Sequence, residues 1–575
     1  MVGATIIGGI GVACGLANDA YKFAIAWVAL VLFLWLLIKT IFWLCCWRNF
    51  KRFLFGLACL ATLIALFYAE EDWRGWHAWN SFKHEWEAKG EHFDYASIIP
   101  PAVPDDQNFA MQPIWIESME AGYGSNVTWQ WYGKKLTAQE QARLVDRLHM
   151  PLTENDAHGP TNSRGNWPKA TLPDLTSWQN YYRALATKTN LFPVVPQPQT
   201  PAQDVLLALS KYNPAIEELR QASLLPYARF PLYSNADHPF DTLLPHLAAL
   251  KACAQVLELR TIAELQNGQS EKALADVKLS LRLADAIRTE PFLISHLVRI
   301  AILQITLQPV YEGLAEHKWS DAQLVDLDAE LAKLDFLSDF KLALRGERSC
   351  AVTAVEFIRH RNLRHFNEIF DMSGNGGRPQ MSVGAILYYL CPNGWFYQNE
   401  LRVSRFLVKW DLPLVNEAEQ TVSPASLHAA DRALDMEFRH RTPENYLEAW
   451  LLPSLGGAAK KFAYAQASVD LARTAIALER YRLAHGEYPE SLAALAPQFI
   501  AQVPHDVIGG SPLPGSGAAS QPLKYRRTGD GQFVLYSVGW NEKDDGGVVI
   551  FTKGSTPDVD RDQGDWVWRY PAKVE

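Results

Sequence analysis

The chain contains few cysteines for its length, and their spacing shows no pairs. Four of the seven cysteines among 575 residues lie in or near the apolar N-terminal region, and the other three are Cys253, Cys350 and Cys391. Zinc sites and disulfide-rich folds need closely spaced or regularly paired cysteines. The sequence therefore indicates neither a disulfide framework nor a zinc site, and one bridge among the three distant cysteines stays open.

Complete catalytic motifs are also missing. There is no Gly-x-Ser-x-Gly segment, and the glycines of the loop Asp371–Pro379 lack the spacing of a phosphate-binding loop. Glu356 and His360 stand four apart on an expected helix and could share a face that holds a metal. The zincin motif needs two histidines that flank a glutamate, so a salt-bridged helix face is favoured here. The neighbouring residues of this segment are Arg359, Arg361, Arg364, His365 and Glu368.

Acidic residues outnumber basic residues outside the N-terminal region. The chain has a net charge of −9, and its first 69 residues carry five basic residues against one acidic residue, a net +4. The rest of the chain therefore carries −13. A surface of this sign repels phosphate backbones, so nucleic-acid binding is not expected.

Two long apolar runs dominate the N-terminal region. Phe23–Trp47 and Phe53–Ala69 are separated only by the basic connection Arg48–Arg52, and acidic residues begin at Glu70. Runs of about 17–25 apolar residues can cross a bilayer as helices. Positive connections stay on the cytoplasmic side. The sequence predicts a transmembrane hairpin over residues 1–69, with the remaining chain outside the cytoplasm; Gly3–Ala17 is short for a span and could form a third membrane segment.

Residues 70–200 are expected to form a juxtamembrane helix followed by an irregular, Pro- and Trp-rich region. Trp73, Trp76 and Trp79 follow directly after the second apolar run. Tryptophans at this position are typical of the headgroup level of a membrane. A structural role at the membrane interface is therefore favoured over a ligand-binding aromatic cage. This juxtamembrane stretch resembles bacterial membrane proteins of unassigned function.

Residues 201–455 show helical periodicity and are expected to form an α-helical domain. Leu243–Leu265 and Glu271–Ile287 form a predicted helical hairpin, with Gly268 after the first helix and Ser270 as the N-cap of the second. The pair resembles one tetratricopeptide hairpin, but no second copy follows at the required period. Further helices are expected over Phe292–Ala315, Asp321–Leu334 and Ser338–Phe366.

Residues 456–575 are expected to form a separate α+β domain with a small antiparallel sheet. A long helix over Lys460–Leu483 precedes two strands joined at Asp530-Gly531, a good hairpin signal. The strands expected in this domain are Pro522–Arg527, Gln532–Gly539, Val548–Phe551 and Trp566–Tyr570.

This C-terminal region carries a specific family resemblance. The segments Ala477–Leu483, Gly486–Pro489, Pro522–Tyr525 and Tyr536–Gly539, followed by Gly546-Gly547, resemble the globular domain of the major pseudopilin of type II secretion. The resemblance covers roughly residues 458–551. It implies a calcium ion in the loop between the last strands. By position in the motif, its ligands would be Ser537 (through its carbonyl), Asn541, Asp544 and Asp545.

A second acidic run, Asp558–Asp565, resembles the start of an EF-hand loop. Gln563 replaces the glycine of the sixth position, and Arg569 stands where a glutamate should close the loop. This run is therefore a weaker metal candidate than the first.

Two classes of function remain. The first is a membrane-tethered scaffold or interaction protein of the inner membrane, with a large periplasmic part that contacts envelope or type II secretion-like proteins. The second is an extracytoplasmic hydrolase with its site in the helical domain. Because no catalytic pattern is complete, the scaffold is the favoured interpretation.

Overall fold

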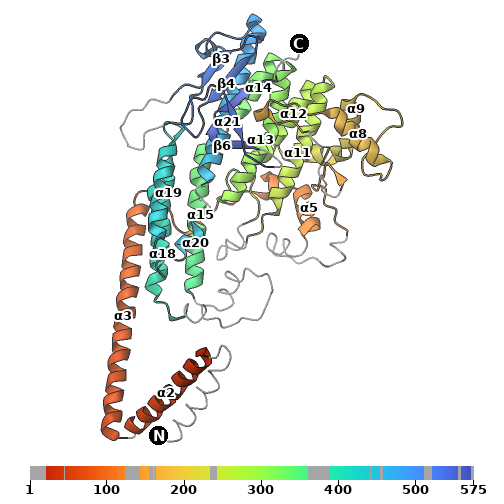
Figure 1. Ribbon diagram of the computed structural model, residues 1–575. Helices are drawn as coiled ribbons and strands as arrows, with labels where there is room; N and C mark the ends of the chain where they lie inside the picture. Colours follow the sequence, from red (N-terminus) through yellow and green to blue (C-terminus); the bar gives the residue numbers. More distant parts are fainter. Residues whose placement is uncertain are drawn as a thin grey trace. The chain divides into compact units, whose positions relative to one another are not determined.

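The computed structural model describes residues 21–44, 46–123, 137, 139, 143–154, 159–160, 164–232, 242–360, 389–440, 442–452, 457–509, 521–554 and 558–571. The fold is mostly helical, with small antiparallel sheets (Figure 1). It divides into two compact units. Unit 1 comprises Met1–His77 and Leu390–Trp395, and unit 2 comprises Ala78–Tyr389 and Phe396–Glu575. The predicted segment Gly3–Ala17 and the loop Asp371–Pro379 lie outside the described residues.

Unit 1 contains the two apolar runs as helices. α2 spans Tyr21–Leu44 and α3 begins at Trp47, so the basic segment Arg48–Arg52 is the first turn of a helix rather than a loop. α3 extends to Glu87, and its apolar window is fully exposed. Of the described helices, only α3 and α13 are long and apolar enough to cross a membrane, and α13 is 67% buried over that window.

The first half of unit 2 is a set of short helices and turns. Its elements are α4 (Tyr95–Ile98), η1 (Asp105–Gln107), η2 (Phe109–Met111), α5 (Pro113–Tyr123), η4 (Trp167–Lys169), α8 (Leu175–Ala186), α9 (Pro201–Leu209), η5 (Ser210–Tyr212) and α10 (Asn213–Ala222). Glu91 connects this part of the chain to the helix that spans Phe336–Arg359. Its carboxylate accepts hydrogen bonds from Arg345 at 2.9 Å and from Arg348 at 2.7 Å.

The longer helices of unit 2 follow the predicted pattern closely. They are α11 (Pro245–Gln266), α12 (Ser270–Asp285), α13 (Leu293–Ala315), α14 (Asp321–Leu331) and α15 (Phe336–Arg359). Gly268 follows the C-cap of α11 with a φ of +72°, as predicted for a residue that ends a helix. The prediction that Ser270 is the N-cap of α12 is wrong: Ser270 is the first helical residue, and Gln269 occupies the N-cap position without a side-chain bond.

Beyond α15, the described chain continues with α18 (Asn393–Phe406), the π-helical turn η7 (Leu407–Asp411), η8 (Leu412–Leu414), β1 (Val415–Asn416), β2 (Thr421–Val422), α19 (Pro424–Phe438), α20 (Glu448–Leu451) and α21 (Ala458–His485). After α21 come η9 (Leu492–Leu495), β3 (Lys524–Arg527), β4 (Phe533–Ser537), β5 (Val549–Phe551), β6 (Val559–Gly564) and β7 (Trp566–Arg569). The sheets have the strand orders β3-β4-β7, β5-β6 and β1-β2, all antiparallel.

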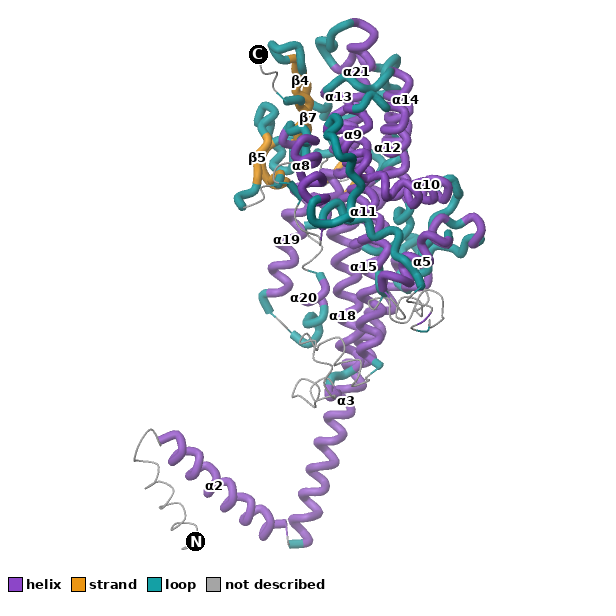
Figure 2. Tube along the Cα trace, turned by 90° about the vertical axis from the view of Figure 1, so that its right-hand side faces the viewer, coloured by secondary structure: helices purple, strands orange, loops and turns teal. Residues whose placement is uncertain are grey.

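α21 is the central helix of unit 2. It packs against α13, α14 and α15 and also against β4, β6 and β7 (Figures 1 and 2). Side chains are buried at nearly every position from Ala458 to Glu479, and many of them are alanines that let neighbouring elements approach closely. The predicted boundary between residues 455 and 456 therefore does not separate two compact units, and neither does the one between 200 and 201. The helix and sheet expected to form a separate domain share one hydrophobic core with the helical region.

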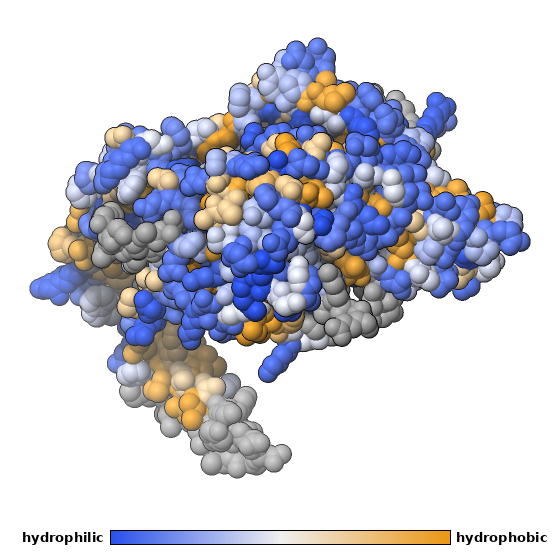
Figure 3. Space-filling view, turned by 90° about the horizontal axis from the view of Figure 1, so that it is seen from above, coloured by the Kyte–Doolittle hydropathy of each residue, from blue (hydrophilic) through white to orange (hydrophobic). Residues whose placement is uncertain are grey.

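The surface of the fold seen from above is mostly hydrophilic, with small hydrophobic patches scattered over it (Figure 3). The long exposed apolar stretches among the described residues belong to α2 and α3.

Candidate functional site

The four predicted calcium ligands lie at the end of β4 and in the loop that follows it. Ser537 ends β4, and the chain then turns through Gly539, Gly546 and Gly547, whose φ values are +70°, +76° and +82°. Glycine is the residue that adopts such backbone angles without strain. The residues Gly539, Gly546 and Gly547 therefore allow the sharp turns that return the chain to β5.

Ser537 lies away from the tip of this loop. Its side chain is fully buried, and its hydroxyl donates to Oδ1 of Asp506 at 2.7 Å. Asp506 also accepts from the backbone N–H groups of Val538 (2.9 Å) and Ile508 (3.0 Å). The Ser537 hydroxyl therefore helps to fix the end of β4 to the segment that precedes the sheet.

The side chains of Asn541 and Asp545 are in contact, whereas the Asp544 side chain contacts Tyr536 and Lys524 instead. The Asn541 side-chain amide donates to Oδ2 of Asp545 at 2.8 Å. Asp544 instead accepts from the Tyr536 hydroxyl at 2.9 Å and lies 3.5 Å from Nζ of Lys524. The hydrogen bond from Tyr536 is the main reason that the pKa of Asp544 is below its usual value.

Asp565, which is not one of the four predicted calcium ligands, fixes the conformation of this loop. Asp565 is 1% exposed, and its carboxylate accepts from the backbone N–H groups of Asp545 (3.2 Å), Gly547 (2.6 Å) and Val548 (3.2 Å). Burial raises the pKa of Asp565 despite these three hydrogen bonds. In the sequence, Asp565 is a metal candidate because it ends the second acidic run. Its role as an acceptor for the loop's backbone N–H groups could not be predicted, because that role depends on the pairing of strands distant in the sequence.

The second acidic run does not form an EF-hand loop. Residues Val559–Gly564 form the strand β6, which pairs with β5 in antiparallel register. A calcium loop of the EF-hand type needs a continuous turn around the ion. The prediction of a loop over Asp558–Asp565 is therefore wrong, because the backbone is extended and hydrogen-bonded to a neighbouring strand.

The arrangement of the first loop does not present a ready calcium site. Among the described residues, no group of three or more His, Cys, Asp or Glu side chains is arranged to hold a metal ion. Calcium prefers six to eight oxygen ligands, whereas here Lys524 and the Tyr536 hydroxyl lie against Asp544 and an amide nitrogen faces Asp545. To bind calcium, the loop would have to exchange these contacts for oxygen ligands.

Calcium binding by Asn541, Asp544 and Asp545 stays a prediction from the sequence. A cation bound only by the folded chain raises stability by about 2.7 kcal/mol at a hundredfold excess over its Kd. The prediction expects millimolar calcium to raise the melting temperature of the detergent-solubilised chain, relative to chelator. It expects no rise in the Asp544→Ala, Asp545→Ala double variant. An equal melting temperature with and without calcium in the parent would contradict it.

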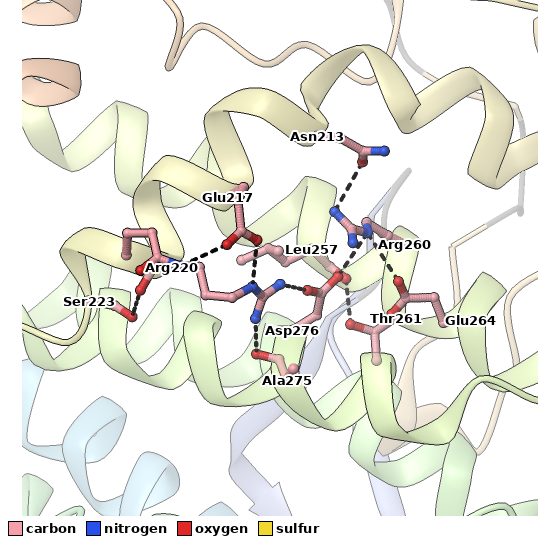
Figure 4. Close-up of polar contacts among 11 residues, drawn as sticks. Asn213, Glu217, Arg220, Ser223, Leu257, Arg260, Thr261, Glu264, Ala275 and Asp276 are labelled. Carbon is pink, nitrogen blue, oxygen red and sulfur yellow. Dashed lines mark hydrogen bonds and ion pairs between the residues drawn. The ribbon is translucent and has the colours of Figure 1, made fainter.

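An ionic cluster around a buried aspartate joins three helices in the helical part of unit 2 (Figure 4). We call Glu217, Arg220, Arg260, Glu264 and Asp276 the Asp276 cluster. Asp276, on α12, is fully buried; its Oδ1 lies 2.5 Å from Nη2 of Arg220 on α10, and its Oδ2 lies 3.1 Å from Nε of Arg260 on α11. Arg220 also donates to the carbonyl of Ala275 at 3.0 Å.

The Asp276 cluster contains one more carboxyl than guanidinium groups. Oε1 of Glu264 lies 3.2 Å from Nε of Arg260, while its buried Oε2 has no hydrogen-bond partner. Burial, followed by repulsion from Asp276, raises the pKa of Glu264 to about 7. Burial also raises the pKa of Asp276. The cluster joins α10, α11 and α12 around the buried carboxyl groups of Asp276 and Glu264.

A histidine, a serine and a carboxylate also meet in the core, in an order that does not suit nucleophilic catalysis. Glu290 accepts from Nε2 of His246 at 2.9 Å and from the hydroxyl of Ser295. A catalytic triad places the histidine between the serine and the carboxylate, so that it can take the serine proton. Here the carboxylate lies between them, and all three side chains are at most 3% exposed. This group is a buried structural network.

The metal candidate on α15 is a salt-bridged helix face in the structure. Arg359 donates to Oε1 of Glu356 at 3.1 Å, which agrees with the interpretation favoured from the sequence. His360 is the C-cap residue of α15, and His365 and Glu368 lie outside the described residues.

Comparison with known proteins gives no independent guide to the site. No protein-family model, no curated protein and no solved structure matches this chain.

Proposed function

We propose that the protein is a membrane-anchored scaffold or interaction protein, with its helical body on the extracytoplasmic side of the inner membrane. The observation that carries the proposal is the full exposure of the apolar window of α3. Of the two described helices that are long and apolar enough to cross a membrane, α13 is 67% buried over its apolar window, whereas α3 is 0% buried. A long apolar surface of this kind is stable in lipid and costly in water.

The charges at the two ends of this window support the proposed orientation. Arg48, Lys51 and Arg52 precede it, and Glu70, Glu71 and Asp72 follow it. Basic residues beside a span are retained on the cytoplasmic side. The N-terminal end of α3 is therefore assigned to the cytoplasm in this proposal, and the chain after Glu70 to the periplasm.

A non-catalytic role is supported by how the buried polar groups are used. Asp506 and Asp565 hold backbone N–H groups, Asp276 holds two arginines, and Glu290 holds His246 and Ser295. Each of these groups supports the fold. The resemblance of the C-terminal region to a pseudopilin favours envelope or type II secretion-like proteins as partners, which co-purification from membranes would identify.

An extracytoplasmic hydrolase is the second candidate function, because two carboxyl groups on neighbouring helices have raised pKa values. Burial raises the pKa of Glu258 on α11 to about 7, and burial raises that of Glu312 on α13 well above its usual value. Carboxyls with raised pKa values can act as general acids. If the protein is a hydrolase, the Glu258→Gln variant should lose its hydrolytic activity. If it is a scaffold, the same variant should still bind the partner proteins.

Alkaline extraction of membranes tests the proposed anchor. We expect the parent chain to stay in the membrane pellet after carbonate treatment. Leu60 and Ile64 are 54% and 50% exposed in the apolar window of α3. Arginine near the centre of a span costs about 2.5–3.5 kcal/mol per residue, so the Leu60→Arg, Ile64→Arg double variant should be released into the supernatant or degraded.

The control for this experiment is Leu224→Arg, at a position of unit 2 that is 77% exposed. This variant should remain in the pellet like the parent. Release of the parent chain by carbonate would contradict the anchor.

A further inference from the structure

A segment far away in the sequence packs on α3 at the end of its apolar run. The Tyr68 hydroxyl donates to the carbonyl of Leu390, and the backbone N–H of Gly394 donates to Oδ1 of Asp72 at 2.8 Å. The indole N–H of Trp395 donates to Oε2 of Glu71 at 3.0 Å. Leu390–Trp395 and α3 up to His77 belong to the same compact unit.

Two glycines allow this close packing. A Cβ atom on Gly394 would lie 1.9 Å from the carbonyl oxygen of Glu71, and one on Gly75 would lie 2.2 Å from the carbonyl oxygen of Gly394. Backbone atoms stand on both sides, so no side chain could rotate away to make room. The contact between the segment Leu390–Trp395 and α3 therefore depends on the absence of side chains at both positions.

The residues around this contact have the character of a membrane interface. Leu390 is 59% exposed, and Trp73 and Trp76 on α3 are 63% and 50% exposed. The ring of Trp395 packs edge-on against Phe67, with 6.5 Å between ring centroids. Tryptophan and tyrosine concentrate at the level of the lipid headgroups, where an amphipathic ring contacts both phases. The exposed Leu390 is held by Tyr68, in the last turn of the apolar run.

We infer that Leu390–Trp395 forms a second contact with the bilayer, with Leu390 inserted at the boundary between headgroups and acyl chains. This inference rests on the proposed membrane anchor, because the depth of Leu390 follows from its contact with Tyr68. The chain thus meets the membrane through α3 and again through a short segment more than 300 residues later in the sequence.

Depth-dependent fluorescence quenching tests the inference on the full chain in phospholipid vesicles. Native cysteines are replaced, and an environment-sensitive dye is attached at Leu390→Cys, Leu63→Cys or Val325→Cys. Leu63 lies inside the apolar run of α3 and is 65% exposed; Val325 lies on α14 in unit 2 and is 43% exposed. We expect a lipid quencher near the headgroups to quench the dye at position 390, a quencher deep in the acyl chains to quench it at position 63, and neither to quench it at position 325.

The two proposals fail in distinguishable ways. If the dye at position 63 is quenched and that at position 390 is not, the second contact is wrong and the anchor stands. If the dye at position 63 is not quenched, the anchor itself is wrong. Adding Gly394→Val should abolish quenching at position 390 and leave position 63 unchanged. Quenching at position 390 that survives Gly394→Val would show that packing on α3 does not place Leu390 at the interface.

Discussion

Replacing Gly346 by alanine is expected to lower the free energy of unfolding by about 3 kcal/mol or more, since overpacking against backbone cannot be relieved by a rotamer change. Gly346 is buried in α15, where the helix passes Pro291, two residues before the first residue of α13. An added Cβ would lie 1.5 Å from the carbonyl oxygen of Pro291 and 2.5 Å from its carbonyl carbon. α15 would have to move away from the start of α13, in the part of the core that contains Glu290 and His246.

Gly529→Ala is the matched control for this substitution. Apart from the chain neighbours of Gly529, no heavy atom would lie within 4 Å of a Cβ added there, and the φ of this residue is not positive. Surface changes of this kind usually alter stability by less than about 0.5 kcal/mol. Chemical denaturation of the detergent-solubilised chain measures both variants, and equal stability of the two would contradict the packing of α15 against Pro291.

Two substitutions in the Asp276 cluster are expected to change stability in opposite directions. Asp276→Ala removes the carboxylate shared by Arg220 and Arg260, which are only 26% and 15% exposed in their side chains. Removing one partner of a buried ion pair costs about 3–5 kcal/mol, and the partial exposure of the arginines places the expected loss near the lower value. Glu264→Gln instead removes a buried charge that lacks a full set of partners.

The effect of Glu264→Gln depends on pH. The pKa of Glu264 is raised from 4.5 to about 7 in the folded chain. Between these values the folded state retains a proton that the unfolded state releases, so stability falls as pH rises through this window. At about 1.36 kcal/mol per pKa unit, the loss by pH 8 is at most about 3–4 kcal/mol.

We therefore expect Glu264→Gln to be more stable than the parent at pH 8 and to differ little from it at pH 4.5. Other buried carboxyls, such as Asp470 with a pKa of about 7 and Glu448 with one of about 8, contribute to the same slope in both proteins. The difference between the two proteins isolates Glu264. A pH-independent difference, or a destabilised Glu264→Gln variant at pH 8, would overturn the assignment of excess charge to this residue.

Local signals in the sequence are sufficient for much of the secondary structure. Gly268 and Pro291 interrupt helical periodicity, and α11, α12 and α13 begin and end near these residues. Asp530-Gly531 predicts the hairpin between β3 and β4, and the pair is antiparallel as expected. These features depend on nearby residues, so a single sequence contains the information.

Features that depend on distant partners do not follow from the sequence. The alanines of α21 do not show which elements cover them, so the pattern predicts a separate domain where the structure buries α21 between helices and strands. The acidic run that forms β6 lacks the alternating apolar pattern of a half-buried strand. Asp506 and Asp565 bind backbone N–H groups, and Asp276 binds arginines, that come close to them only when the chain folds. The packing of Gly394 on α3 likewise joins residues 322 positions apart.

We propose that α3 carries the chain across a membrane, with everything after Glu70 outside the cytoplasm. The most direct measurement uses the full chain with a reporter fused after Glu575, either alkaline phosphatase, which is active only outside, or green fluorescent protein, which matures only inside. A fusion after Asn49 at the start of α3 serves as the cytoplasmic control. We predict active phosphatase and no fluorescence for the fusion after Glu575, and the reverse after Asn49. Fluorescence from the fusion after Glu575 would contradict the account.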